Sequence, residues 1–195
     1  MALIAGCHEP LTPQQQAART RADATRCQNG EAAACPDACK SGGPNFTCAR
    51  ACEGPAEPDG EACEQLAARY EREVDVPDPD APPRSIAPVD DERATEAHER
   101  ACKLGLKQGC RQAAARILNG QGGKRPPNAV TDLLKTGCDQ LQDPDSCCAM
   151  AQLNFRLGQG RMSANVGIDF WEEGRRWAKR ADHYGGSCPL PAGVK

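Results

Sequence analysis

The stretch Cys-Arg-Gln-Ala-Ala-Ala-Arg-Ile-Leu-Asn-Gly-Gln-Gly (residues 110–122) decides the fold, because it returns as Cys-Ala-Met-Ala-Gln-Leu-Asn-Phe-Arg-Leu-Gly-Gln-Gly (residues 148–160). Both copies place a glycine pair at the same offset from the opening cysteine, so the period is 38 residues (148 − 110). Each copy runs from a cysteine through a small-apolar stretch typical of a helix into Gly-x-Gly, a pattern typical of a helix end where the chain turns back. A repeat of this length indicates stacked helical units.

A second helical stretch follows each copy, at residues 129–136 and 169–180, so the repeating unit is a helix-turn-helix. An earlier and more divergent unit begins at Cys63, and residues 91–102 supply its second helix. Between its two helices, residues 74–89 carry five prolines among aspartates. Proline breaks a helix and favours extended chain, so we expect a solvated, extended insertion inside this repeat.

The composition requires stabilisation beyond hydrophobic burial. Aromatic residues make up only 4% of the 195 residues, and alanine supplies much of the apolar share. An alanine core lets helices approach closely but buries little apolar area per residue. The thirteen cysteines are the remaining source of stability, and so many indicate disulfides and an oxidising compartment.

The charge pattern argues against nucleic acid as the main partner. The net charge is −3, and acidic and basic residues are mixed, with no basic stripe of the kind that binds nucleic acid. No apolar run is long enough for a transmembrane helix.

The first seven residues resemble the signal of a bacterial lipoprotein. Ile4-Ala5-Gly6-Cys7 matches a lipobox, in which the cysteine becomes the lipidated first residue of the mature chain. No basic segment precedes it and few apolar residues do, which fits a truncated start. The alternative is an ordinary cysteine in a frayed terminus. Lipidation of Cys7 leaves twelve cysteines, an even number that can pair completely.

Five pairs of cysteines bracket short turns, and small residues at such junctions bring two Cα atoms within disulfide range. The predicted bridges are Cys27–Cys35, Cys39–Cys48, Cys52–Cys63, Cys102–Cys110 and Cys138–Cys148. The remaining Cys147 and Cys188 would then form a sixth bridge that ties the chain end to the last full repeat. Two alternatives stay open near the front: nested pairing of Cys35 with Cys52 around Cys39–Cys48, and a zinc site.

The predicted organisation has five parts. They are a signal-like segment at 1–7, a flexible or helical stretch at 8–25, short degenerate cysteine-rich helical repeats at 26–62, further cysteine-rich helical repeats at 63–188 with the insertion at 74–89, and a tail at 189–195.

The junction Ala101-Cys102-Lys103-Leu104-Gly105 through Gly109-Cys110 resembles that of the Sel-one-like repeats, relatives of the tetratricopeptide repeat, in their secreted cysteine-rich subgroup. Gly120-x-Gly122 and Gly158-x-Gly160 are similar to that family's glycines between helices. The resemblance covers about residues 63–188. It implies an all-α fold of helix-turn-helix units stacked as an α/α superhelix, or solenoid. The family's Leu-Gly-x-x-Tyr is replaced here, so no ligand surface is inherited.

We therefore expect a protein-binding scaffold of the bacterial cell envelope, exported to the periplasm or outer membrane as a lipoprotein, or secreted. We expect no enzyme activity, no catalytic residue, no cofactor and no metal. The alternative is a β-lactamase-type or penicillin-binding protein, an activity attached to some cysteine-rich members of the family. No serine is followed three residues later by lysine, and the three histidines lie far apart in sequence, so neither serine nor zinc β-lactamase chemistry has a motif here.

Four further features have a functional and a structural interpretation. The aromatic residues Phe170, Trp171, Trp177 and Tyr184 are a candidate binding patch, or they fill the final core layer and cap the stack. His98 is a possible general base, but we favour a solvated residue on a helix face. We expect a solvated basic face formed by Arg175, Arg176, Lys179 and Arg180, with acidic partners as the alternative. Residues 120–124 faintly resemble a phosphate loop, but no strand precedes them, so a turn is expected.

Overall fold

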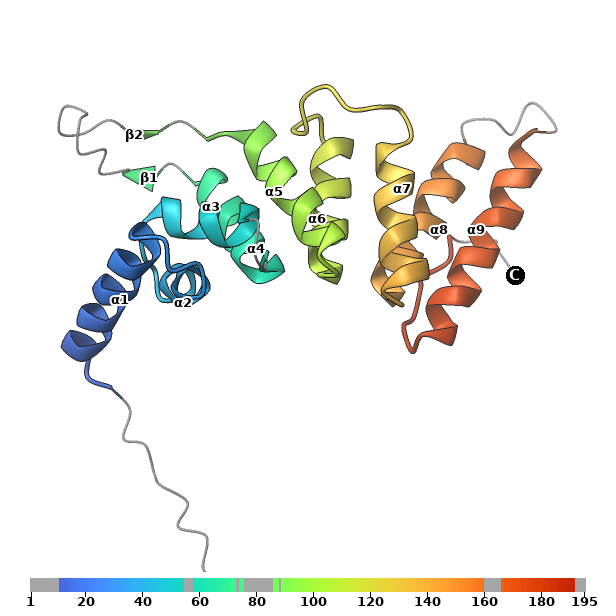
Figure 1. The fold of residues 1–195 in the computed structure, drawn as a ribbon. Coiled ribbons are helices and arrows are strands. Elements are labelled where there is room, and N and C mark those ends of the chain that lie inside the picture. Colours follow the sequence, from blue (N-terminus) through green and yellow to red (C-terminus); the bar gives the residue numbers. More distant parts are fainter. Residues whose placement is uncertain are drawn as a thin grey trace, which may run out of the picture.

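The computed structural model describes residues 11–54, 58–72, 74–75, 86–87, 89–159 and 166–191. Within these ranges the chain is predominantly helical, and Figure 1 shows the helices following one another across the molecule. The helices are α1 (Pro13–Gln28), α2 (Ala34–Lys40), α3 (Asn45–Glu53), α4 (Gly60–Tyr70), α5 (Asp91–Lys103), α6 (Lys107–Leu118), α7 (Ala129–Lys135), a π turn η1 (Thr136–Gln140), α8 (Pro144–Gln159) and α9 (Val166–His183).

Two short strands lie within the insertion, near its two ends. Strand β1 (Val74–Asp75) pairs antiparallel with β2 (Ile86–Ala87), as expected for extended chain. The segment between them, residues 76–85, lies outside the described residues, as do residues 1–10 with Cys7 and residues 192–195.

Side-chain caps fix where several helices begin. Thr12 and Gln15 form a capping box at the start of α1, so the stretch expected to be flexible or helical is a helix from Pro13 onward. Asp59 accepts hydrogen bonds from two backbone amides at the start of α4, and Asp90 accepts one at the start of α5. Each cap satisfies amides that would otherwise lack a partner, which stabilises these helices at the ends of short loops.

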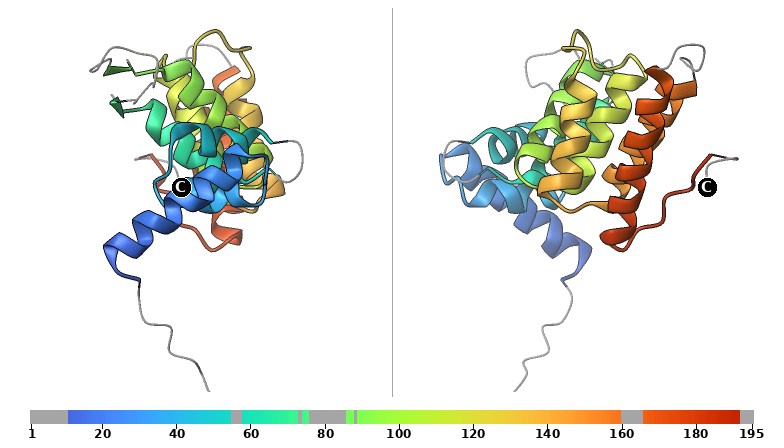
Figure 2. Two further views of the ribbon diagram at one scale, coloured as in Figure 1. Left: turned by 60° about the vertical axis from the view of Figure 1, so that its left-hand side comes forward. Right: turned by 90° about the vertical axis from the view of Figure 1, so that its right-hand side faces the viewer.

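Each helix packs mainly on its neighbours in sequence, from α1 on α2 to α8 on α9. Fewer contacts join some helices that are two apart in sequence, as between α2 and α4 and between α6 and α8. Figure 1 shows α1 at one end of this succession and α9 at the other, and Figure 2 shows the same helices from two further directions, from which they partly overlap. The contacts between helices are therefore largely local in sequence.

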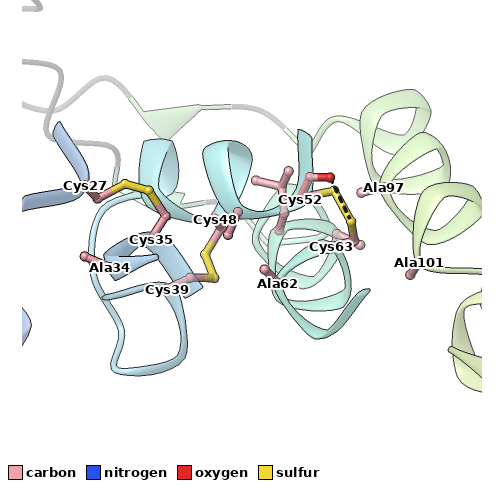
Figure 3. Close-up of a cluster of buried hydrophobic side chains, with 13 residues drawn as sticks. Cys27, Ala34, Cys35, Cys39, Cys48, Cys52, Ala62, Cys63, Ala97 and Ala101 are labelled. Carbon is pink, nitrogen blue, oxygen red and sulfur yellow. Dashed lines mark hydrogen bonds between the residues drawn. A yellow bond between two sulfur atoms is a disulfide. The ribbon is translucent and has the colours of Figure 1, made fainter. Parts of the chain in front are cut away.

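The buried apolar side chains of the described residues form two separate clusters. The first lies between α1 and α5 and consists almost entirely of buried cysteine and alanine, with Leu66 as its one larger buried side chain (Figure 3). The second lies between α6 and α9 and includes larger side chains, among them Met150, Phe155 and Trp177. The first cluster therefore depends on covalent bridges more than the second does.

Six disulfides join the twelve described cysteines, and four have the predicted partners. Cys27–Cys35, Cys39–Cys48, Cys52–Cys63 and Cys102–Cys110 have Cα–Cα distances of 4.5–4.8 Å. In the first three bridges Cys35 pairs with Cys27 and Cys52 pairs with Cys63, so the nested pairing of Cys35 with Cys52 does not occur. All the cysteines of the possible zinc site are likewise in disulfides, which leaves none to bind zinc there. So many disulfides indicate an oxidising, extracytoplasmic environment.

The two C-terminal pairings were predicted wrongly. The bridges are Cys138–Cys147 and Cys148–Cys188, with their partners exchanged relative to the prediction. Adjacent residues on a helix point about 100° apart, because a helix has 3.6 residues per turn. On α8 it is Cys147, fully buried, that faces Cys138 in η1, whereas Cys148 faces the chain end.

The error came from the second glycine pair. Gly120 lies just after α6 with a positive φ of 77° and ends that helix as expected. Gly158, by contrast, lies inside α8 and is buried, so α8 runs through it and is 16 residues long against 12 for α6. Aligning the copies on their glycines therefore displaced the equivalent cysteine by one position.

Candidate functional site

A groove between α6 and α8 is the candidate binding site. It has a volume of about 430 Å³, and α7 contributes Leu134 to its lining. Its apolar lining includes Ala114, Ala115 and Leu118 from α6 and Ala149 and Leu153 from α8. Leu118 is 54% exposed, the highest value among the exposed large apolar residues of the described chain.

Two arginines line the groove, and they differ in whether a described acidic residue pairs with them. Arg111 on α6 pairs with Asp145 and lies 3.6 Å from Asp143, so its charge is compensated. Arg156 on α8 is exposed and makes no ion pair with any described residue. The groove therefore combines an exposed apolar floor with one uncompensated positive charge, which suits a segment that presents an apolar side chain together with a carboxylate.

A buried ionic network lies at the base of the insertion, where α4, α5 and α6 meet. His98 is 3% exposed, with Nδ1 2.8 Å from Glu64 Oε1 and Nε2 2.9 Å from Glu71 Oε1. Arg116, 8% exposed, donates to the same Glu71 oxygen at 2.8 Å and pairs with Asp91. Glu71 ends α4 and Asp91 begins α5, so the network joins the two sides of the insertion.

The interpretation of His98 as a solvated residue was wrong. It lies on the buried face of α5, together with Ala94, Ala101 and Cys102. A neutral imidazole can donate from only one nitrogen, whereas here both nitrogens face carboxylates, an arrangement that favours the imidazolium. A general base needs a free nitrogen and access to substrate, and His98 has neither.

The network shifts the pKa of His98 upward. Burial, the largest single influence, lowers the pKa, but the hydrogen bonds and charges of Glu64 and Glu71 together outweigh it and hold the pKa above 6.5. The charged groups that face the His98 ring are Glu64 of α4 and Glu71 just after α4. Arg116 of α6 also forms an ion pair with Glu71.

We expect the free energy of unfolding to fall as pH rises above about 6.5. A group whose pKa is raised in the folded state contributes stability that is fully present below its unfolded pKa of 6.5 and is lost as pH rises through the folded value. Urea unfolding at a series of pH values from about 5 to 9 measures this slope.

The variant His98→Gln should lose the part of that slope that the histidine contributes, because glutamine does not titrate. The control is His183→Gln, which removes a histidine from the exposed end of α9 and leaves the network intact. If His98→Gln kept the slope of the unsubstituted protein, the imidazolium would not be its source.

The sequence contained an unused signal for this network. On α6, Arg116 lies at helical spacing from the small buried residues Gly109 and Ala113. On α5, His98 lies at helical spacing from buried alanines in the same way. A charged residue in register with small buried residues requires a buried partner. No comparable signal marks the groove, whose two main walls come from α6 and α8, helices that are not consecutive in the chain.

The aromatic candidates lie mostly against the second core cluster. Trp177 is 6% exposed, and Trp171 and Tyr184 pack against the cluster from its edge. The ring centroid of Trp171 is 5.4 Å from that of Phe155. Phe170 is half-buried. This placement favours the core-filling interpretation over a recognition patch.

The remaining sequence candidates have ordinary structural roles. Arg175, Arg176, Lys179 and Arg180 are exposed on α9, as expected of a solvated face. The loop at 120–124 is an irregular turn after α6, not a strand-to-helix loop. Ser146 is fully buried and donates to Asp143 Oδ2 at 2.6 Å, which makes it part of a helix start rather than an exposed nucleophile.

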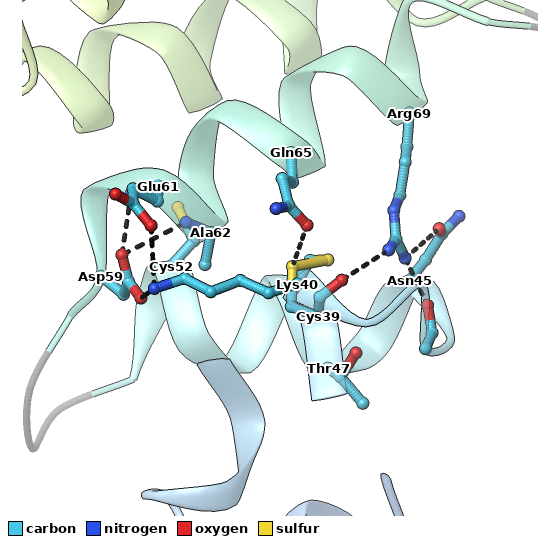
Figure 4. Close-up of a disulfide and its surroundings, with 12 residues drawn as sticks. Cys39, Lys40, Asn45, Thr47, Cys52, Asp59, Glu61, Ala62, Gln65 and Arg69 are labelled. Atoms are coloured by element: carbon cyan, nitrogen blue, oxygen red, sulfur yellow. Dashed lines mark hydrogen bonds and ion pairs between the residues drawn. A yellow bond between two sulfur atoms is a disulfide. The ribbon is translucent and has the colours of Figure 1, made fainter. Parts of the chain in front are cut away.

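A second polar cluster near the Cys39–Cys48 bridge is structural (Figure 4). Arg69 of α4 donates to the backbone oxygens of Cys39 at 3.2 Å and Gly43 at 2.6 Å. Lys40 of α2 lies 3.2 Å from Asp59 and 2.8 Å from Glu61. These bonds tie α4 to α2 and to the turn before α3. They occupy the charged groups within the protein, so the cluster offers no free ligand site.

No family model, curated protein or solved structure matches this chain. None of the described helices is both long and apolar enough to cross a membrane. The described residues contain no group of three histidine, cysteine or acidic side chains placed to hold a metal ion.

Proposed function

We propose that this protein is an interaction scaffold of the bacterial cell envelope, built from Sel-one-like repeats and binding another protein through the groove between α6 and α8. The groove supports the proposal because it leaves Leu118 exposed and Leu153 half-buried beside Arg156, which has no ion-pair partner among the described residues. Export as a lipoprotein through Cys7 is part of the same proposal, and the disulfides support an exported location.

A solenoid is the architecture we propose for the repeats. Bridges join α3 to α4, α5 to α6 and η1 to α8, which are the junctions between successive helix-turn-helix units. The first helices of neighbouring units, α6 and α8, also touch each other. In such a stack the first helices line one continuous face, and the groove lies on that face.

Site-specific photo-crosslinking tests the binding site. A benzophenone side chain at position 118, inside the groove, is expected to capture one predominant protein when the chain is expressed in its native host. The same group at position 190 is the control, because Leu190 is 44% exposed but lies outside the groove. Mass spectrometry identifies the captured protein.

The substitution Arg156→Glu is expected to reduce the yield of that adduct at least about tenfold, since reversing a charge that faces a carboxylate costs more than about 1.4 kcal/mol. Arg175→Glu on α9 is the matched charge control. Equal adducts from positions 118 and 190, or an adduct insensitive to Arg156→Glu, would contradict the proposal. Hydrolysis of a chromogenic β-lactam in proportion to purified, oxidised protein, resistant to chelator and contaminant controls, would favour an enzyme instead.

A further inference from the structure

The sixth disulfide differs from the other five in its accessibility. The ten cysteines of the other bridges are all between 0% and 2% exposed. Cys148 and Cys188 are only half-buried and pack at the edge of the second core cluster. A thiolate must reach a sulfur atom to attack it, so the five buried bridges are protected while the helices around them stay packed.

The Cys148–Cys188 bridge also differs in what it holds. The other bridges span 8–11 residues at the turns between consecutive helices, whereas this one spans 40 residues and ties the chain end back onto α8. Gly186 lies against Pro144 at the start of α8, and its amide donates to the backbone oxygen of Ala181. Beyond Gly186, no backbone hydrogen bond between described residues holds positions 187–191. The bridge is therefore the main anchor of this segment.

Opening the bridge would leave the helical core in place. Trp177, Ala178 and Ala181 bury α9 in the second cluster independently of Cys188. The neighbouring Cys147 remains bound to Cys138 on the other side of α8. The consequence of reduction is thus confined to the terminal segment and to one face of α8.

We propose that Cys148–Cys188 is a site of thiol–disulfide exchange, at which a small thiol reduces and modifies the protein while the other five bridges and the helices stay intact. The thiolate attacks Sγ of Cys188 on the irregular terminal segment and forms a mixed disulfide. The bond between the two cysteine sulfurs breaks, and its electron pair stays on Sγ of Cys148, which takes up a proton. A second thiol attacks the thiol-derived sulfur of the mixed disulfide, so Cys188 leaves as a thiol and the two small thiols become one disulfide.

The exchange site borders the groove. Gln152 lines the groove and donates from Nε2 to Sγ of Cys148 at 3.7 Å. A group attached at this bridge would therefore lie close to the wall of the proposed binding face. The exchange reaction itself does not depend on whether that face binds a protein.

Graded reduction with glutathione tests the proposal. Oxidised protein is incubated with increasing glutathione, quenched with acid and alkylated with N-ethylmaleimide, and each cysteine is then assigned by peptide mapping. We expect alkylation of Cys148, and alkylation or glutathionylation of Cys188, at reductant concentrations at least about tenfold below those that expose any of the other ten cysteines. The far-UV circular dichroism should stay constant over that window.

The double variant Cys148→Ser/Cys188→Ser is the matched control. It should fold with the same helical spectrum and show no alkylation in the same window. Release of any buried cysteine together with Cys148 and Cys188, or loss of helical signal in step with their release, would overturn the proposal. A double variant that fails to fold would overturn it as well, because the bridge would then be needed for the fold.

Discussion

Complete reduction of the six disulfides is expected to unfold the protein. In the chain-entropy account, each of the five bridges that close loops of 8–11 residues contributes about 2.5–3 kcal/mol. Together they match the whole stability of a typical domain, about 5–15 kcal/mol. The first core cluster has few large side chains to compensate, since it is built from alanine and cysteine around Leu66.

Far-UV circular dichroism and thermal melting of the oxidised and the fully reduced protein measure this effect. The oxidised protein should melt cooperatively, and the reduced one should have little helical signal and no cooperative transition. The control is the Cys148→Ser/Cys188→Ser variant, which lacks one bridge and should still melt cooperatively. A reduced protein that kept its helices and its melting temperature would show that packing alone stabilises the fold.

The second large effect is expected from Gly109→Ala, at the junction of α5 and α6. A Cβ atom at this position would lie 2.7 Å from the backbone nitrogen of Cys102 and 2.8 Å from the backbone oxygen of His98. Backbone atoms cannot move aside as a flexible side chain can, so the two helices would have to separate next to the Cys102–Cys110 bridge. We expect a loss of about 2 kcal/mol in the free energy of unfolding, net of the gain in helix propensity from alanine.

Gly60→Ala is the matched control, because Gly60 also lies at the start of a helix after a junction. A Cβ there would meet Leu104 Cβ at 3.4 Å and Leu106 Cβ at 3.5 Å, which is close to ordinary contact. This variant should therefore be neutral or slightly stabilising. Urea unfolding of both variants tests the contrast, and equal effects at the two positions would contradict the close approach of α5 and α6.

The local features of the fold could be predicted because they depend on neighbours in sequence. Four bridges have the predicted partners, since a short turn between two helices leaves each cysteine only one partner within reach. The helices at 91–102 and 129–136 were placed within a few residues of α5 and of α7 with η1. The insertion was predicted as extended chain from its prolines, and β1 and β2 lie within it, near its two ends.

The candidate site could not be predicted to the same extent. The groove needs α6 and α8 side by side, and these two helices are separated in sequence by α7 and η1. His98 was misplaced because its two partners, Glu64 and Glu71, lie 34 and 27 residues before it, on the other side of the insertion. Burial of a charged ring becomes favourable only when such partners are brought to it.

The sequence alone was enough to predict the helical fold, the oxidising environment and the bridges at most of the helix junctions. These follow from cysteine spacing, alanine content and glycine or proline at turns, which act over a few residues. Only the tertiary structure decided which of Cys147 and Cys148 faces Cys138, where His98 is buried, and which apolar side chains stay uncovered. The physical reason is that helical periodicity fixes which residues share a face, whereas the rotation of each helix toward its neighbours is set by packing between distant parts of the chain.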